Sequence, residues 1–164
     1  MAIMGVASLF SMATFGQVKA TTLQSVFIYS ALKYMEWPND DLPEITIVVL
    51  GESPIYDELV KVAQTKKVGS RSITVNKASS IDEVTKGHIL FISSNKVGSL
   101  STHLESINKN AILIITEKEG ALSQGSDLNF VQRGERIAFQ LSEKSLASKK
   151  IKVSSAFSNL AVRQ

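Results

Sequence analysis

Ile45-Thr46-Ile47-Val48-Val49-Leu50 is a nearly continuous run of aliphatic side chains. A strand with one face in water alternates apolar and polar residues, so this run predicts a strand that is covered on both faces. Residues 88–93 and 111–116 have the same apolar character. Strands of this kind are typical of parallel sheets with helices packed on both faces. The three runs therefore indicate an α/β fold.

The segments around these strands alternate between helical and extended patterns. Gly51-Glu52-Ser53-Pro54 caps a helix predicted over residues 55–63, because proline suits the first turn of a helix. Residues 128–131 and 136–141 predict a hairpin whose turn places Gly134 at positive φ. The other predicted elements are a strand over 72–76, a helical turn over 81–86 opened by Ser80, and helices over 97–107, 143–147 and 155–162. This order predicts a single-domain sandwich: a mostly parallel six-stranded sheet with an antiparallel edge hairpin, flanked by about five helices.

The first helix is predicted over residues 22–36, with Thr21 or Thr22 as its cap. It is expected to end before Trp37-Pro38, because the residue before a proline is displaced from the α region. Apolar side chains surround this helix almost completely: Leu23, Val26, Phe27, Ile28, Tyr29, Leu32, Tyr34 and Met35. A surface helix has one apolar stripe, so this helix is predicted to be buried on several sides or to meet a partner.

The composition excludes several classes of protein. The chain has 164 residues, no Cys, and 18 Lys and Arg against 15 Asp and Glu, a formal charge of +3. The missing Cys exclude disulfides, thiolate nucleophiles and zinc–thiolate sites. The basic residues are not clustered among aromatic ones, which argues against nucleic acid as a partner. The late basic residues Lys144, Lys149, Lys150 and Lys152 predict a solvated face rather than a contact with anionic lipid.

The N-terminal residues 1–18 contain no charged side chain and are followed by Lys19-Ala20. An apolar stretch that ends in Val-x-Ala matches the h-region and cleavage site of a secretory signal peptide. We therefore expect residues 1–20 to be a signal peptide cleaved after Ala20, with residues 21–164 as the exported domain. The alternative is a retained membrane anchor, which needs roughly 20 apolar residues. This run is shorter and is diluted by Gly, Ser and Thr.

Several of these segments carry a resemblance to a known family. Residues 27–38, Phe-Ile-Tyr-Ser-Ala-Leu-Lys-Tyr-Met-Glu-Trp-Pro, resemble the opening helix of the YfiR-like family of periplasmic proteins. Residues 45–51, 87–93 and 120–140 follow in that family's order and spacing. The resemblance implies a compact α/β sandwich in the periplasm. It also implies a repressor of an inner-membrane diguanylate cyclase, or a partner of a sensor histidine kinase, that acts on cyclic-di-GMP and biofilm formation.

The chain departs from the family pattern at several positions. Family members often carry a Cys just before the strand that begins here at His88, and this chain has Gly87. The disulfide switch proposed for the family cannot operate without thiols. The late Gly-Gly turn of the family reads Gly125-Ser126, and the Asn common at the end of the last strand is replaced in this chain's Phe139-Gln140.

The sequence offers little sign of catalytic chemistry. His88 and His103 have no converging ligands, so they are interpreted as ordinary core or surface histidines, and no metal or cofactor is expected. No nucleophile-elbow, dinucleotide-binding or Walker motif occurs. A receiver domain is excluded, because no acidic residue follows the strand that ends near Ser93. The chain is therefore predicted not to be an enzyme.

Two functional hypotheses from different classes remain. The first is a protein that binds and modulates a signalling enzyme, with contacts through Phe27, Tyr29, Tyr34, Met35, Trp37 and Pro38. Such an apolar helix is also compatible with a homodimer. The second is a small-ligand sensor that uses the crevice at the carboxyl ends of the parallel strands, where open α/β sheets bind ligands. That crevice would be lined by Gly51, Ser53, Ser93, Asn95 and Thr116.

Overall fold

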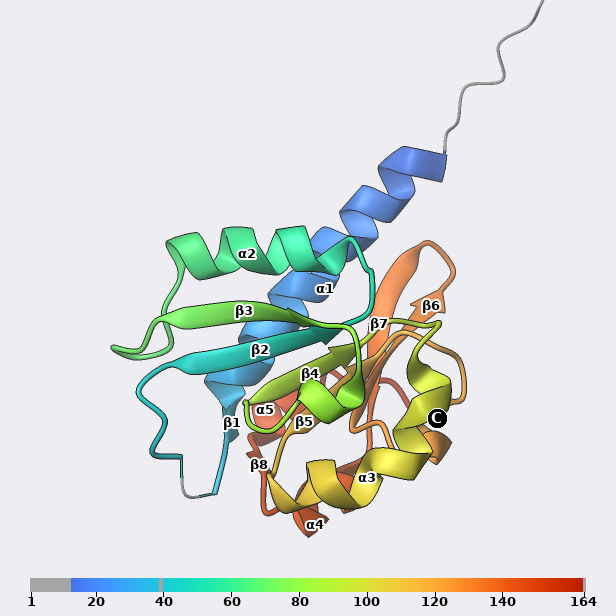
Figure 1. The fold of residues 1–164 in the computed structure, drawn as a ribbon. Helices are drawn as coiled ribbons and strands as arrows, with labels where there is room; N and C mark the ends of the chain where they lie inside the picture. The colour runs from blue at the N-terminus through green and yellow to red at the C-terminus, as the bar shows by residue number, and fades with distance from the viewer. Residues whose placement is uncertain (1–12, 39, 164) are drawn as a thin grey trace, which may run out of the picture.

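A computed structural model of the chain describes residues 13–38 and 40–163. Its centre is a six-stranded sheet with the order β3-β2-β4-β5-β6-β7 (Figure 1). The strands are β2 (Ile45–Leu50), β3 (Ile73–Ala78), β4 (Ile89–Ile92), β5 (Leu113–Thr116), β6 (Leu128–Arg133) and β7 (Arg136–Leu141). The strands from β3 to β6 pair in parallel, and β7 pairs antiparallel with β6. The predicted α/β class and its antiparallel edge hairpin are confirmed.

The continuous aliphatic runs supply both faces of the sheet. Successive residues of a strand point to opposite faces, so β2 places Ile47 and Val49 in one apolar cluster and Val48 and Leu50 in another. All four residues of β4, and all four of β5, are buried. A core on each side explains why these strands lack the alternation of a half-exposed strand.

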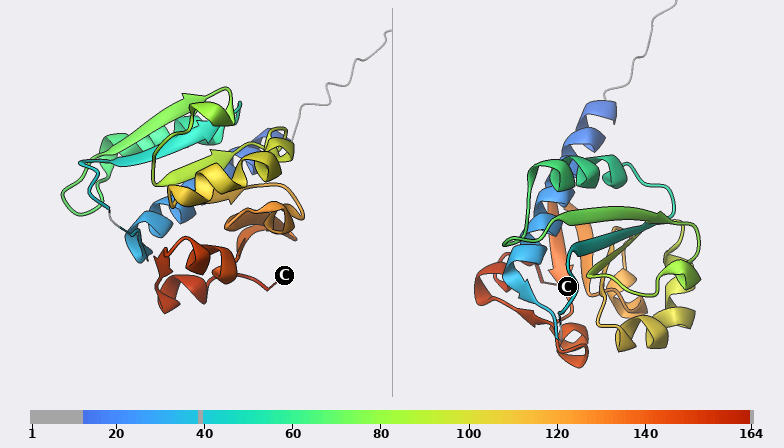
Figure 2. Two further views of the ribbon diagram at one scale, coloured as in Figure 1. Left: turned by 60° about the horizontal axis from the view of Figure 1, so that its bottom comes forward. Right: turned by 60° about the vertical axis from the view of Figure 1, so that its left-hand side comes forward.

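Helices cover the two faces in separate groups (Figure 2). On one face pack α1 (Ala13–Tyr34), α2 (Ile55–Thr65), α4 (Glu143–Ser148) and α5 (Ser155–Ser158), which contribute residues to the first cluster. On the other face lie α3 (Leu100–Lys109) and three short 3₁₀ turns, η1 (Ile81–Glu83), η2 (Val97–Ser99) and η3 (Ala121–Gln124). The described residues thus form five α-helices, as the sequence predicted.

The start of α1 differs from the prediction. Thr21 and Thr22 do not cap the helix, because the helix is already formed at Ala13 and continues through them. Its first turns extend beyond the sheet in Figure 1. The first twelve residues of the predicted signal peptide lie outside the described residues. Within the described part of the chain, every helix is too short or too polar to cross a bilayer.

The end of α1 also differs. Met35 and Glu36 were expected to be helical, but they form the short strand β1 (Met35–Glu36). This strand pairs antiparallel with β8 (Lys152–Val153), which the sequence analysis did not find. Two-residue strands carry no periodicity, so only the tertiary pairing defines them. The pairing attaches the C-terminal segment to the end of the first helix.

Local signals were read correctly at several turns. The Ser80 side chain and Glu83 form a capping box around η1. Gly134 has φ +60° in the tip of the β6–β7 hairpin, the left-handed conformation that glycine adopts without strain. The helix predicted from residue 97 begins with the turn η2 and becomes α-helical at Leu100.

Candidate functional site

The carboxyl ends of β2 and β4 bring together three of the predicted crevice residues: Gly51, Ser93 and Asn95. The Ser93 hydroxyl lies 2.9 Å from the Leu50 carbonyl oxygen and 2.7 Å from Asn95 Oδ1. Gly51 has φ +82°, and a Cβ at this position would lie 2.4 Å from Ser93 Oγ. The side chains therefore fill the space between these strand ends, and their polar atoms bond to one another.

Ser53 has a local role at the start of α2. Its hydroxyl oxygen accepts a hydrogen bond of 3.3 Å from the backbone N–H of Ile55. The first N–H groups of a helix lack partners within the helix, so a side-chain acceptor at this position stabilises the helix start. This contact agrees with the interpretation of residues 51–54 as a helix cap.

Thr116 belongs to a buried polar chain with Ser126 and Asn129. Thr116 Oγ1 lies 2.8 Å from Ser126 Oγ and 2.7 Å from the Asn129 side-chain oxygen, while Asn129 Nδ2 has no partner. A hydroxyl has one proton, so Thr116 can donate only one of these two bonds. Turning the Asn129 amide so that Nδ2 faces Thr116 resolves this conflict. Asn129 then donates to Thr116, Thr116 to Ser126, and Ser126 to the Leu128 carbonyl at 2.8 Å.

An open cavity lies beyond Thr116, between the end of β5 and the β6–β7 hairpin. Its volume is about 600 Å³, within the range of small-molecule sites. Its lining residues are Glu117, Glu119, Gly120, Leu122, Ser123, Phe130, Val131, Gln132, Arg133 and Gln140. Of the predicted crevice residues, none lines this cavity, although Thr116 directly precedes it. The open space at this edge of the sheet thus lies beside the end of β5, and not between β2 and β4 where the crevice was predicted.

Glu117 is the half-buried acid of this cavity. Burial raises the pKa of its carboxyl group, and a hydrogen bond from Gln24 of α1, 3.3 Å from Nε2 to Oε2, partly opposes that rise. No basic side chain of the described residues forms an ion pair with Glu117. The sequence places Glu117 and Glu119 in a predicted turn. Acidic residues in turns are usually exposed, so the burial of Glu117 could not be predicted.

The aromatic residues predicted to bind a partner mostly serve the core. Phe27 packs edge-on against Phe139 with ring centroids 5.1 Å apart, and Met35 is only 5% exposed. The Tyr29 hydroxyl donates to the Lys67 carbonyl at 3.0 Å. Tyr34 stacks on Phe157 and remains 47% exposed. Of the predicted set, Tyr34 presents the largest exposed fraction of an apolar ring.

Two other apolar side chains of α1 are exposed, and they were not among the predicted partner contacts. Leu23 is 41% exposed and Val26 is 52% exposed. They lie three residues apart, so they occupy neighbouring positions on the same side of the helix. Because apolar residues occur all round this helix, the periodicity of the sequence does not show which side is exposed.

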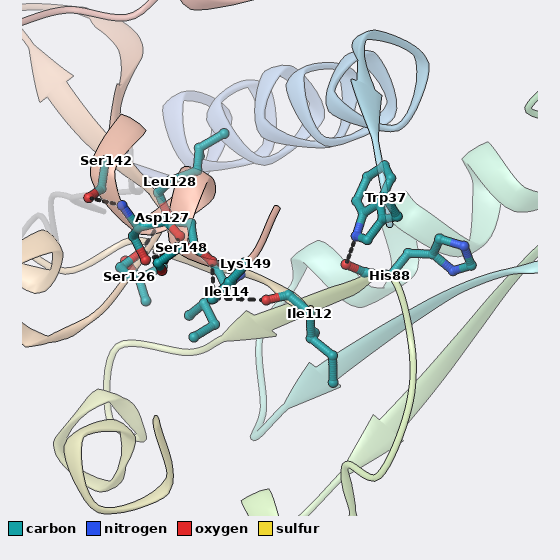
Figure 3. A network of polar contacts seen from close by, with 12 residues as sticks. Trp37, His88, Ile112, Ile114, Ser126, Asp127, Leu128, Ser142, Ser148 and Lys149 are labelled. Atoms are coloured by element: carbon teal, nitrogen blue, oxygen red, sulfur yellow. Dashed lines mark hydrogen bonds and ion pairs between the residues drawn. The ribbon is translucent and has the colours of Figure 1, made fainter. Parts of the chain in front are cut away.

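The Trp37-Pro38 turn lies at the opposite, amino-terminal edge of the parallel sheet. Trp37 Nε1 donates to the His88 carbonyl oxygen at 3.1 Å, and its ring meets the His88 ring edge-on at 5.4 Å (Figure 3). Both Trp37 and Pro38 are half-buried. They line a small cavity of about 180 Å³ together with Asp40, Asp41 and His88.

His88 is 2% exposed, and both its ring nitrogens have partners. The Thr46 N–H donates to Nδ1 at 3.1 Å, so Nδ1 carries no proton. Nε2 must then carry the proton, and it donates to Asp40 Oδ1 at 3.0 Å. Burial raises the pKa of Asp40, but hydrogen bonds from Arg71, at 2.7 Å, and from His88 outweigh it and lower that pKa. His88 is thus a core histidine with satisfied hydrogen bonds, as the sequence suggested.

The predicted solvated face at the late lysines is wrong for Lys149. Its ammonium group is buried against Asp127 at 2.5 Å and also donates to the Ile112 carbonyl at 2.9 Å (Figure 3). Asp127 further accepts from the Ile114 N–H at 2.7 Å and from the Ser145 hydroxyl at 2.5 Å. Burial lowers the pKa of Lys149, and the Asp127 charge opposes that shift. Sequence alone could not distinguish this lysine from its exposed neighbours.

The described residues contain no group of three or more His, Asp or Glu side chains that could hold a metal ion. The polar clusters above bond largely among themselves, whereas the cavity beside Glu117 combines open volume with a half-buried acid whose pKa is raised by burial.

Residues 21–162 match the model of a protein family described as YfiR/HmsC-like. The chain belongs to the YfiR/HmsC-like family. This is a family of regulatory, non-catalytic proteins of the periplasm that act in cyclic-di-GMP signalling. A comparison with curated proteins finds no match. The family match spans every strand of the sheet and begins at the residue that follows the predicted cleavage position.

Proposed function

We propose that this protein binds the periplasmic part of an inner-membrane signalling enzyme, a diguanylate cyclase or a sensor histidine kinase, and modulates its activity without catalysing a reaction. Membership of the YfiR/HmsC-like family over residues 21–162 is the observation that carries the proposal. A binding protein can act by stabilising one of two states of its partner, and this needs no chemistry of its own.

The contact surface that the proposal assigns is the exposed side of α1, namely Leu23, Val26 and Tyr34. Clustered exposed apolar side chains are typical of interaction surfaces, and tyrosine is common where binding energy is concentrated. Phe27 and Met35 would support this surface from the core. Trp37 and Pro38 would fix the turn that follows it.

The test is a pull-down from detergent-solubilised membranes with the purified protein as bait. The paired substitution Leu23→Glu and Val26→Glu places charge on the α1 surface and is expected to abolish capture of the signalling enzyme. Ser101→Glu is the matched control, because it adds the same side chain to α3 on the other face of the sheet. Equal capture by all three proteins, or capture of no cyclase or kinase by the unsubstituted protein, would refute the proposal.

The alternative function is a small-ligand sensor, and the cavity beside Glu117 is the observation that favours it. The cavity lies at the edge where open α/β sheets bind ligands. A thermal-shift screen with small periplasmic metabolites tests this function. A compound that raises the melting temperature of the unsubstituted protein, but not of Gln132→Ala, supports it. The absence of any such compound would leave the interaction hypothesis as the sole candidate.

A further inference from the structure

The β2–β4 junction contains a buried histidine whose hydrogen bonds are compatible with only one protonation state. The backbone of His88 donates to the Thr46 carbonyl at 2.9 Å, and its ring accepts from the Thr46 N–H at 3.1 Å. His88 therefore holds both polar groups of Thr46 at the start of β2. The same residue's carbonyl accepts from Trp37 Nε1 and from the Leu113 N–H.

We propose that His88 is a proton-operated latch: in acid its ring takes up a proton at Nδ1, releases the Thr46 N–H and loosens the contacts that Trp37 and Asp40 make with His88. A charged imidazole has two N–H donors and no acceptor, so its Nδ1–H would face the Thr46 N–H donor. Two donors cannot share one hydrogen bond. The ring and the Thr46 N–H must therefore move apart, and Trp37 packs against that ring.

The charged groups around His88 allow the ring to become charged without a general loss of structure. Asp40 faces Nε2 at 3.0 Å and can bond to the charged ring as it does to the neutral one. Arg71 bonds to the other oxygen of Asp40 at 2.7 Å and weakens the attraction of Asp40 for the added charge. Asp41 and Lys86 line the adjoining cavity with charges of opposite sign. The conflict is thus confined to Nδ1, where the only partner is the Thr46 N–H.

The location of this latch connects it to the rest of the molecule. Trp37 follows directly on β1, and β1 joins the end of α1 to β8. A change at Trp37 can therefore reach the Tyr34 end of the α1 surface. Histidine is the side chain whose charge ordinarily responds to mild acid. The latch would let a chain without Cys respond to acid instead of to a change in redox state. This proposal does not depend on the identity of the partner.

The fluorescence of Trp37 measures the latch directly, because Trp37 is the only tryptophan in the chain. We expect one transition in its emission as the pH of the purified protein falls from about 8 to about 4.5. The transition should persist in His103→Gln, which removes the only other histidine. It should be absent in His88→Asn, whose side-chain oxygen can still accept the Thr46 N–H but whose amide does not titrate.

Amide hydrogen exchange in the unsubstituted protein gives a second measurement that needs no variant. Across the transition the Thr46 N–H should lose protection about tenfold, the effect of losing one hydrogen bond, relative to the Ser93 N–H. Ser93 is a suitable reference because its N–H bonds to Leu50 at the far end of the same strand pair. The proposal is overturned if no emission transition occurs, if His88→Asn retains it, or if Thr46 and Ser93 keep the same relative protection.

Discussion

Two polar clusters attach loops to this sheet, and they differ in their access to water. The Asp127–Lys149 cluster is fully buried, and its ion pair bonds to the backbone of β5 and the residue before it. The His88–Asp40 cluster buries its histidine but leaves Asp40 and Arg71 partly in solvent. A buried charge that loses its partner has no water to replace it, whereas a partly exposed charge does. The first cluster should therefore govern stability, and the second should respond to pH.

The largest effect is expected from Asp127→Leu, which leaves the Lys149 ammonium group buried without its counter-ion. Breaking a buried pair in this way costs about 3–5 kcal/mol of unfolding free energy. Lys149→Met should cost a similar amount, and the double variant should lose clearly less than the sum of the two. Urea denaturation of the four proteins measures this coupling. Strictly additive losses would show that the ion pair is not the stabilising contact.

The exposed pair Glu105–Lys109 on α3 is the matched control for that cycle. Both of its side chains are largely in solvent. Glu105→Leu is expected to change the free energy of unfolding by less than about 0.5 kcal/mol, the usual value of an exposed helix pair.

A smaller loss is expected from Asp40→Asn, which removes the charge shared by Arg71 and His88. The loss should be about 0.2–1 kcal/mol near neutral pH, because solvent screens this pair. Burial raises the pKa of Asp40, but the interactions with Arg71 and His88 outweigh it and lower that pKa, so the folded state releases this proton more readily than the unfolded chain. The stabilisation is therefore present at neutral pH and is lost as the pH falls through the folded-state pKa. Denaturation at a series of pH values should show the two proteins converging in acid, and a constant difference would contradict the assignment.

The smallest effect, and one of opposite sign, is expected from Glu117→Gln in the cavity. Burial raises the pKa of Glu117, so its charged form costs stability above the folded-state pKa, and that cost disappears as the pH falls through it. Glu117→Gln should thus be slightly more stable than the unsubstituted protein at neutral pH, with equal stability in acid. Thermal unfolding at both pH values measures the difference. A destabilised variant at neutral pH would indicate a basic partner for Glu117.

Elements with a local sequence pattern could be predicted from the sequence, and elements without one could not. The aliphatic runs of β2, β4 and β5 gave the buried parallel sheet, because covering both faces of a strand requires apolar residues at every position. The hairpin and the caps followed from single residues such as Gly134 and Ser80. The strand pair β1–β8 was missed, because neither member is long enough to show a pattern.

The candidate sites were less accessible to prediction. Lys149 resembles its solvated neighbours in sequence, yet it is the buried partner of Asp127 from another part of the chain. Met35 and Tyr34 are adjacent and both apolar in character, but one is in the core and the other is exposed. Gly51, Ser93 and Asn95 lie together at one edge of the sheet, where they fill the space instead of lining a cavity.

The sequence by itself determined the class of fold, the family and the absence of thiol chemistry, because these depend on local periodicity, motif order and composition. The tertiary structure decided which charges are paired, which side of α1 faces solvent and where the sheet edge is open. Those properties depend on contacts between residues far apart in the chain, such as Asp127 with Lys149 and Thr46 with His88. Hydrogen bonds and ion pairs of this kind leave no periodic trace in the sequence, since a single residue on each side is enough to form them.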